Sequence, residues 1–184
     1  MGRGNSGAGG RTEKKIRAEL KLAEDSIRNG EHETLIVIGK NGERVYEKTD
    51  GERSHVQFEI TAEMRDSVMT HNHPGGTCFS AEDLNAAFVT AAREMRACHA
   101  NGYYSIRRQF EIGDYIDAGY KNFARDYRDA VGNFMKTVTN PRWLRGPKTE
   151  ELAESLTRDV NDYKRTWLRK HAKAYGWEFT EGGK

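Results

Sequence analysis

The sequence is short of cysteine and proline and has no long apolar run. Of its 184 residues, two are cysteine and three are proline. Two cysteines are too few for a disulfide framework, so we expect both thiols to be reduced. No apolar run approaches the roughly 18 residues that a membrane-spanning helix needs. The N-terminus also lacks the apolar stretch of a signal peptide, and these absences together predict a cytoplasmic protein without a membrane segment.

An excess of charge of one sign is also missing. The 30 Lys and Arg residues are nearly balanced by 28 Asp and Glu residues, so the net charge is +2. Overall charge therefore gives no case for nucleic-acid binding, and any such case depends on local clusters. The mean hydropathy of −0.88 is low for a globular chain, which predicts a small core, while the 10% of aromatic residues argues against global disorder.

The N-terminal part of the chain predicts an arm and then a helix. Residues 2–11 are rich in glycine and have no apolar side chain larger than alanine, so we expect residues 1–11 to form a flexible arm. Residues 12–29 predict a helix that Thr12 begins and Gly30 ends. Its apolar residues recur at helical spacing and share one face: Ile16, Leu20, Ala23 and Ile27.

Residues 30–108 have the pattern of a small unit of helices and strands. Asn41-Gly42 is a strong hairpin signal between two runs of strand-forming residues. The expected strands are residues 34–38, 44–47, 55–60, 68–70 and 103–106. A helix is expected over residues 80–100, with an apolar stripe of Leu84, Phe88, Ala91, Met95 and Cys98.

Residues 109–184 are expected to form a helical extension. Apolar residues at helical spacing predict helices over about 114–138 and 150–175. The chain as a whole is therefore predicted to be α+β, with a small, mostly antiparallel sheet. An N-terminal helix and the C-terminal helical extension would flank that sheet.

The most informative segment is Thr70 to Asp83, which reads THNHPGGTCFSAED. His71 and His73 are separated by one residue at the end of a predicted strand, so both imidazoles point to the same side. Pro74-Gly75-Gly76 allows the chain to double back, which brings Asp83 in the next helix toward them. Two imidazoles and one carboxylate suit Zn²⁺, with a fourth position left for water. Zinc lowers the pKa of such water to about 7.

This segment resembles the His-x-His-Pro…Ser-x-x-Asp signature of JAB/JAMM metalloproteases, and its His-Asn-His-Pro-Gly string is similar to the RadC branch. The resemblance covers residues 30–108, so it implies a JAMM-like core there. It implies that His71, His73 and Asp83 bind zinc and that Ser80 stabilises the oxyanion. It also implies an upstream Glu as general base, which we assign to Glu33, with Glu31 and Glu43 as alternatives.

One departure from the signature is visible, because nine residues rather than ten separate His73 from Asp83. Similar shortened versions look like domains of phage head-morphogenesis proteins. The resemblance therefore implies a zinc-dependent hydrolase of amide or isopeptide bonds, of phage or mobile-element origin and located in the host cytoplasm. A simpler reading of Ser80 and Asp83 is that they cap the following helix. Cys78 in the same loop is read as a small packing residue.

A basic stretch near the C-terminus suggests other functions. Residues 163–173 contain five Lys or Arg and no acid, with aromatic residues interleaved. Such a face can bind phosphates or a protein partner, and the candidate contacts are Lys164, Arg165, Arg169 and Lys170. The alternatives to a hydrolase are therefore a nucleic-acid-binding protein or a non-catalytic phage protein that inhibits a host defence nuclease. An amphipathic helix with solvated basic residues also explains the stretch.

Overall fold

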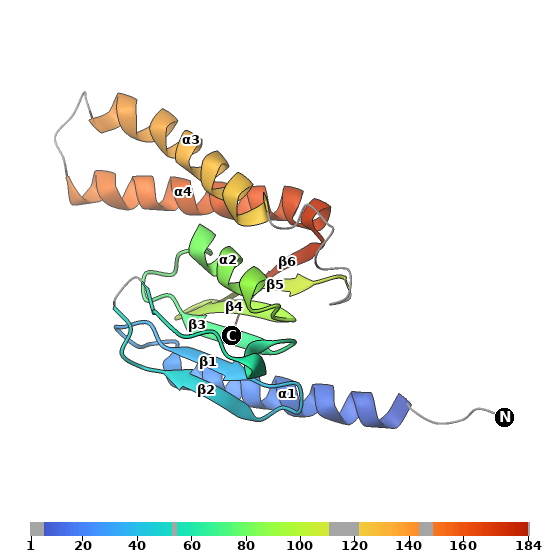
Figure 1. Ribbon diagram of the computed structural model, residues 1–184. Coiled ribbons are helices and arrows are strands. Elements are labelled where there is room, and N and C mark those ends of the chain that lie inside the picture. The colour runs from blue at the N-terminus through green and yellow to red at the C-terminus, as the bar shows by residue number, and fades with distance from the viewer. Residues whose placement is uncertain (1–5, 53–54, 111–121, 144–148, 184) are drawn as a thin grey trace.

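The computed structural model describes residues 6–52, 55–110, 122–143 and 149–183. Helices cover both faces of one six-stranded mixed sheet (Figure 1). The long N-terminal helix lies against one face, and the three later helices lie on the other side. This arrangement confirms the predicted α+β class.

The strand order in the sheet is β2-β1-β3-β4-β5-β6. The strands are β1 (Leu35–Ile38), β2 (Arg44–Lys48), β3 (Val68–Asn72), β4 (Glu94–His99), β5 (Gly102–Arg108) and β6 (Trp177–Gly182). Within the described residues, β3 and β4 are the one parallel pair, and the other four neighbouring pairs are antiparallel. The sheet is therefore mostly antiparallel, as predicted. The parallel pair is decisive for the site, because the chain must cross over between β3 and β4.

Helix α1 (Ser6–Ile27) packs on the first face of the sheet through the predicted stripe. That stripe meets alternate residues of the neighbouring strands: Ile36, Ile38, Val68 and Cys98. The predicted flexible arm is wrong for residues 6–11, which belong to the helix. A Cβ added at Gly9 or Gly10 would meet nothing within 4 Å outside the helix's own backbone, so tertiary packing does not hold this part of the helix. Once residues 16–27 are packed, each added residue gains one helical hydrogen bond, and the helix extends outward.

Helices α2 (Ala81–Val89), α3 (Phe123–Trp143) and α4 (Glu150–His171) lie on the second side of the sheet. A 3₁₀ turn, η4 (Ala172–Tyr175), follows α4, and another, η1 (Ala62–Met64), precedes β3. The second core joins strand and helix residues, among them Leu35, Met69, Met95, Phe123, Tyr127 and Trp177. No helix in the described ranges is long and apolar enough to cross a membrane.

The predicted helix over residues 80–100 is wrong in its second half. Helix α2 ends at Val89, Ala91 takes a left-handed φ of 52°, and residues 94–99 form the interior strand β4. The apolar residues fit helical spacing, but Met95 and Ala97 also alternate along a strand, and Cys98 faces the opposite side of the sheet. Glu94 and Arg96 are buried beside them, and tertiary ion pairs to α1 stabilise these two charges. No pattern within the segment itself reveals those partners.

The predicted C-terminal helical extension is also corrected. Its last residues form β6, which pairs with β5 and completes the sheet, and Trp177 is fully buried. The helix expected from residue 114 is described from Phe123 and runs to Trp143; residues 111–121 lie outside the described residues. The strand expected over residues 55–60 does not form. The C-terminal region therefore shares the core of the sheet.

Candidate metal centre

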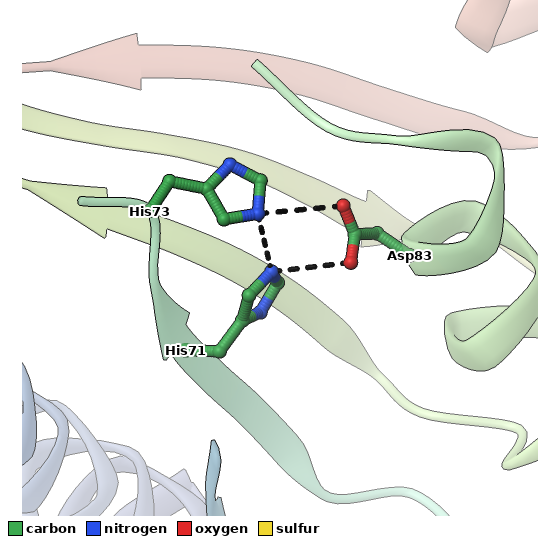
Figure 2. A group of neighbouring side chains, drawn as sticks. All are labelled: His71, His73 and Asp83. Carbon is green, nitrogen blue, oxygen red and sulfur yellow. Dashed lines mark hydrogen bonds and ion pairs between the residues drawn. The ribbon is translucent and has the colours of Figure 1, made fainter. Parts of the chain in front are cut away.

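His71 and His73 lie at the carboxyl end of β3 and point toward the side of α2. They alternate with Asn72, because successive side chains of a strand point to opposite faces. The chain then turns back through residues 74–79 and enters α2, whose first turn carries Asp83. The crossover from β3 to β4 therefore sets the start of α2 above the end of β3. Figure 2 shows the two imidazoles and the carboxylate directed toward one another.

The three side chains converge on one point. The Nε2 atoms of His71 and His73 are 2.8 Å apart. Asp83 places Oδ1 3.2 Å from Nε2 of His71 and Oδ2 3.5 Å from Nε2 of His73. Both histidines are more than nine-tenths buried. Among the described residues, this is the one group of His, Cys, Asp or Glu side chains with ligand atoms close enough to hold a metal ion.

The donor set fits Zn²⁺. Two ligand atoms at about 2.0 Å from a tetrahedral zinc ion lie about 3.3 Å apart. The two nitrogen–oxygen separations of 3.2 and 3.5 Å agree with that spacing. The distance of 2.8 Å between the two Nε2 atoms is shorter. The two imidazole rings would need to move apart by about 0.5 Å to fit that geometry. Two imidazoles and one carboxylate leave a fourth position for water or substrate.

The tautomer of His73 suits metal binding. Its Nδ1 lies 2.6 Å from the backbone carbonyl oxygen of Thr77. A carbonyl can only accept a hydrogen bond, so Nδ1 carries the proton. In the neutral ring, the lone pair of Nε2 then points into the cluster. Such an outer contact fixes the orientation of a ligand and increases its basicity.

Asp83 is held by a capping box with Ser80. The hydroxyl of Ser80 accepts a hydrogen bond from the backbone nitrogen of Asp83, and Oδ2 of Asp83 accepts from the backbone nitrogen of Ser80 at 2.6 Å. The Ser80 hydroxyl also donates to Oδ2 at 2.9 Å. The helix-capping role of Ser80 and Asp83 is therefore compatible with a metal-ligand role for Asp83, since the helix cap also orients the carboxylate. The shorter loop does not move Asp83 away from the histidines.

Opposite pKa shifts are found within the cluster. Burial alone would lower the pKa of His73, but Asp83, the Thr77 carbonyl and Glu33 together outweigh it and raise that pKa. Burial alone would raise the pKa of Asp83, but the two imidazoles hold it well below its usual range. The cluster therefore favours a proton on the imidazole of His73 beside the ionised carboxylate of Asp83. A divalent cation would replace that proton.

Glu33 lies at the edge of the cluster, just before β1. Its Oε1 is 3.9 Å from Nε2 of His73, and the residue is 6% exposed. Burial raises the pKa of Glu33 above its usual value, which suits a proton acceptor near neutral pH. The alternatives Glu31 and Glu43 are exposed, and Glu43 pairs with Lys15. Of the three candidate glutamates, Glu33 is therefore the one that lies beside the histidines.

Asn72 positions the segment that carries Glu33, and sequence reasoning missed this role. Its side chain points away from the histidines and accepts a hydrogen bond from Thr34 N at 2.7 Å. It also donates to the carbonyl oxygens of Gly30 and His32. Gly51 supports the same segment, because a Cβ there would collide with the Glu33 carbonyl. The alternation of residues 71–73 was the signal that Asn72 faces another part of the chain.

We expect Asn72→Ala to destabilise the protein by about 2–3 kcal/mol, because three buried hydrogen bonds are lost. The capacity of the cluster to bind a metal should stay unchanged, since the three candidate ligands are intact. Denaturant unfolding with metal analysis measures both quantities. Asn85→Ala is the matched control, because Asn85 is exposed on α2. Equal stability losses in the two variants would show that Asn72 does not hold the segment.

A pocket of about 420 Å³ opens at the cluster. One wall is the irregular segment 55–58, which contributes His55, Val56 and Phe58. Lys164 of α4 also lines the pocket, and its Nζ is 3.5 Å from the carbonyl oxygen of Cys78. Burial lowers the pKa of Lys164. Helix α4 therefore contributes directly to the site.

The other basic candidates do not gather on one free surface. Arg165 pairs with Asp162 and Glu181, and Arg169 also pairs with Glu181. Lys170 is exposed, whereas Lys164 faces the pocket. Cys78 is buried, and burial raises the pKa of its thiol to about 12. Its side chain is not part of the ligand group found in the described residues, in line with a packing role.

A scan against protein-family models, a search of curated proteins and a search of solved structures gave no match to this chain. The geometry of the site and the short motif that forms it are therefore the features that point to a function.

Proposed function

We propose that this chain is a JAMM-like, zinc-dependent hydrolase of amide or isopeptide bonds. The observation that supports it best is the convergence of the His71, His73 and Asp83 ligand atoms within 4.8 Å of one another, with Glu33 beside them. A structural zinc site is closed by four protein ligands, whereas a catalytic site keeps a position open. Three ligands that lie beside an open pocket fit a catalytic site.

His71, His73 and Asp83 would hold Zn²⁺ there. When bound, the ion supplies a Lewis acid that polarises a carbonyl group and brings the pKa of coordinated water to about 7. Glu33 accepts a proton from the attacking water and transfers it to the leaving amine. The carbon–nitrogen bond breaks, and the products are a carboxylate and an amine.

Ser80 and Thr77 keep the ligands in place. Ser80 orients the carboxylate of Asp83, and the Thr77 carbonyl orients the ring of His73. The role of oxyanion donor that the resemblance implies for Ser80 requires its hydroxyl to turn away from Asp83, because a hydroxyl has one proton to donate.

We expect the purified protein to bind about one zinc ion per chain and to hydrolyse members of a peptide and isopeptide panel. His71→Ala should lose both the metal and the activity. Metal analysis by mass spectrometry and mass-resolved peptide digestion measure these outcomes. His32→Ala is the matched control, because His32 is exposed and lies outside the ligand group.

The proposal is wrong if the protein holds no zinc under saturating conditions. It is also wrong if His71→Ala keeps the hydrolytic activity of the parent. The phage or mobile-element origin, the cytoplasmic location and the alternative of a nuclease-inhibiting binding protein stay predictions from the sequence.

A further inference from the structure

An apolar hollow adjoins the metal pocket. It has a volume of about 320 Å³ and lies between α3 and α4 beside the loop that follows the histidines. Its walls include Met135, Leu156 and Val160. Thr77 and Lys164 line both this hollow and the metal pocket. The two cavities therefore meet at Lys164.

Lys164 offers a cation at this junction. It is half-buried and forms no ion pair with a carboxylate of the described residues. Its hydrogen bond to the Cys78 carbonyl is long at 3.5 Å. A partly desolvated ammonium with so weak a partner attracts an anionic group of a ligand.

The loop is fixed to α4 by Asn161 and to α3 by Tyr127 near this lysine. The side-chain oxygen of Asn161 accepts a hydrogen bond from Cys78 N at 2.5 Å, and the Tyr127 hydroxyl donates to the Phe79 carbonyl at 2.7 Å. The hollow is thus held in a constant position relative to the histidines.

We infer that the substrate is a peptide with an apolar C-terminal residue, which the enzyme releases. This inference rests on the proposed hydrolase function. The side chain of that residue occupies the hollow, and its carboxylate pairs with Lys164. The scissile carbonyl carbon is only three bonds from the carboxylate carbon, so it lies in the metal pocket. Water adds to that carbonyl, the carbon–nitrogen bond breaks, and the proton taken by Glu33 goes to the amino group of the released residue.

Binding tests this inference separately from turnover. The probes are acetyl-Ala-Leu and its C-terminal amide, titrated calorimetrically into the Glu33→Gln variant with added zinc and with EDTA. We expect the acid to bind about tenfold more tightly than the amide in both conditions. Replacing Leu by Ser in the acid should weaken binding about tenfold or more, since a buried Leu side chain is lost.

Lys164→Met keeps the length of the side chain and removes its charge. We expect it to abolish the preference for the acid, whereas Lys170→Met, at an exposed position of the same helix, should keep it. Equal binding of acid and amide by the parent overturns the inference, and so does a preference that survives Lys164→Met. If zinc binding and amide hydrolysis remain in that case, the proposed function stands. Absence of zinc and turnover overturns both.

Discussion

Replacement of Glu33 by Gln should lower kcat by about 10²–10⁴-fold, because the amide cannot accept the proton of the attacking water. Zinc content should stay near that of the parent, since Glu33 is 3.9 Å from the nearest histidine nitrogen and lies outside the ligand group. A loss of kcat without a loss of zinc identifies Glu33 as a general base and not as a metal ligand. Steady-state kinetics on a hydrolysed peptide, with metal analysis of the same preparation, measures it.

Two other glutamates serve as controls. Glu31→Gln and Glu43→Gln change exposed positions on either side of the same strand, so each should keep kcat within about twofold. A Glu33→Gln enzyme as active as these controls would exclude Glu33 as the base. If Glu33→Gln lost its zinc, Glu33 would act as a ligand.

Arg96→Ala should destabilise the protein by about 3–5 kcal/mol, the typical loss when one partner of a buried ion pair is removed. The guanidinium makes a bidentate contact with Glu24, at 2.5 and 3.0 Å, and lies 3.4 Å from Glu94. Both carboxylates are almost completely buried. Without Arg96, two buried negative charges lose their shared cation. Urea unfolding measures the change as a lower transition midpoint.

Lys21→Ala is the matched control for this ion pair. Lys21 pairs with Asp25 on the same helix, but its side chain is 77% exposed. Exposed pairs of this kind contribute at most about 1 kcal/mol. A loss in Arg96→Ala no larger than that in Lys21→Ala would show that the buried network does not stabilise the contact between α1 and the sheet.

The candidate metal site was largely predictable because the residues that form it lie close together in the sequence. Two histidines separated by one residue at a strand end share a side, whatever the rest of the fold does. A serine three residues before an aspartate is also a local capping signal. Glu33 was assigned by the resemblance alone. Its place near His73 is set by Asn72 and Gly51, which no periodicity connects to it.

The prediction from the sequence was wrong where helical spacing and strand alternation coincide. The run from Leu84 to Cys98 satisfies helical spacing and, in its second half, strand alternation. The choice between them was made by Glu24 and Arg17 on α1, which pair with the buried charges of β4. Lys164 was interpreted from its basic neighbours as part of a solvent-facing patch. Only the packing of α4 against the loop placed it at the pocket.

The amino-acid sequence by itself determined the α+β class, the hairpin at Asn41-Gly42 and the pair of histidines, because each depends on neighbours within a few residues. Only the tertiary structure decided that β4 and β6 join the sheet, that Glu33 reaches His73 and that Lys164 borders the site. Those outcomes depend on buried charges and hydrogen bonds between segments that lie far apart along the chain. Such partners meet only after folding.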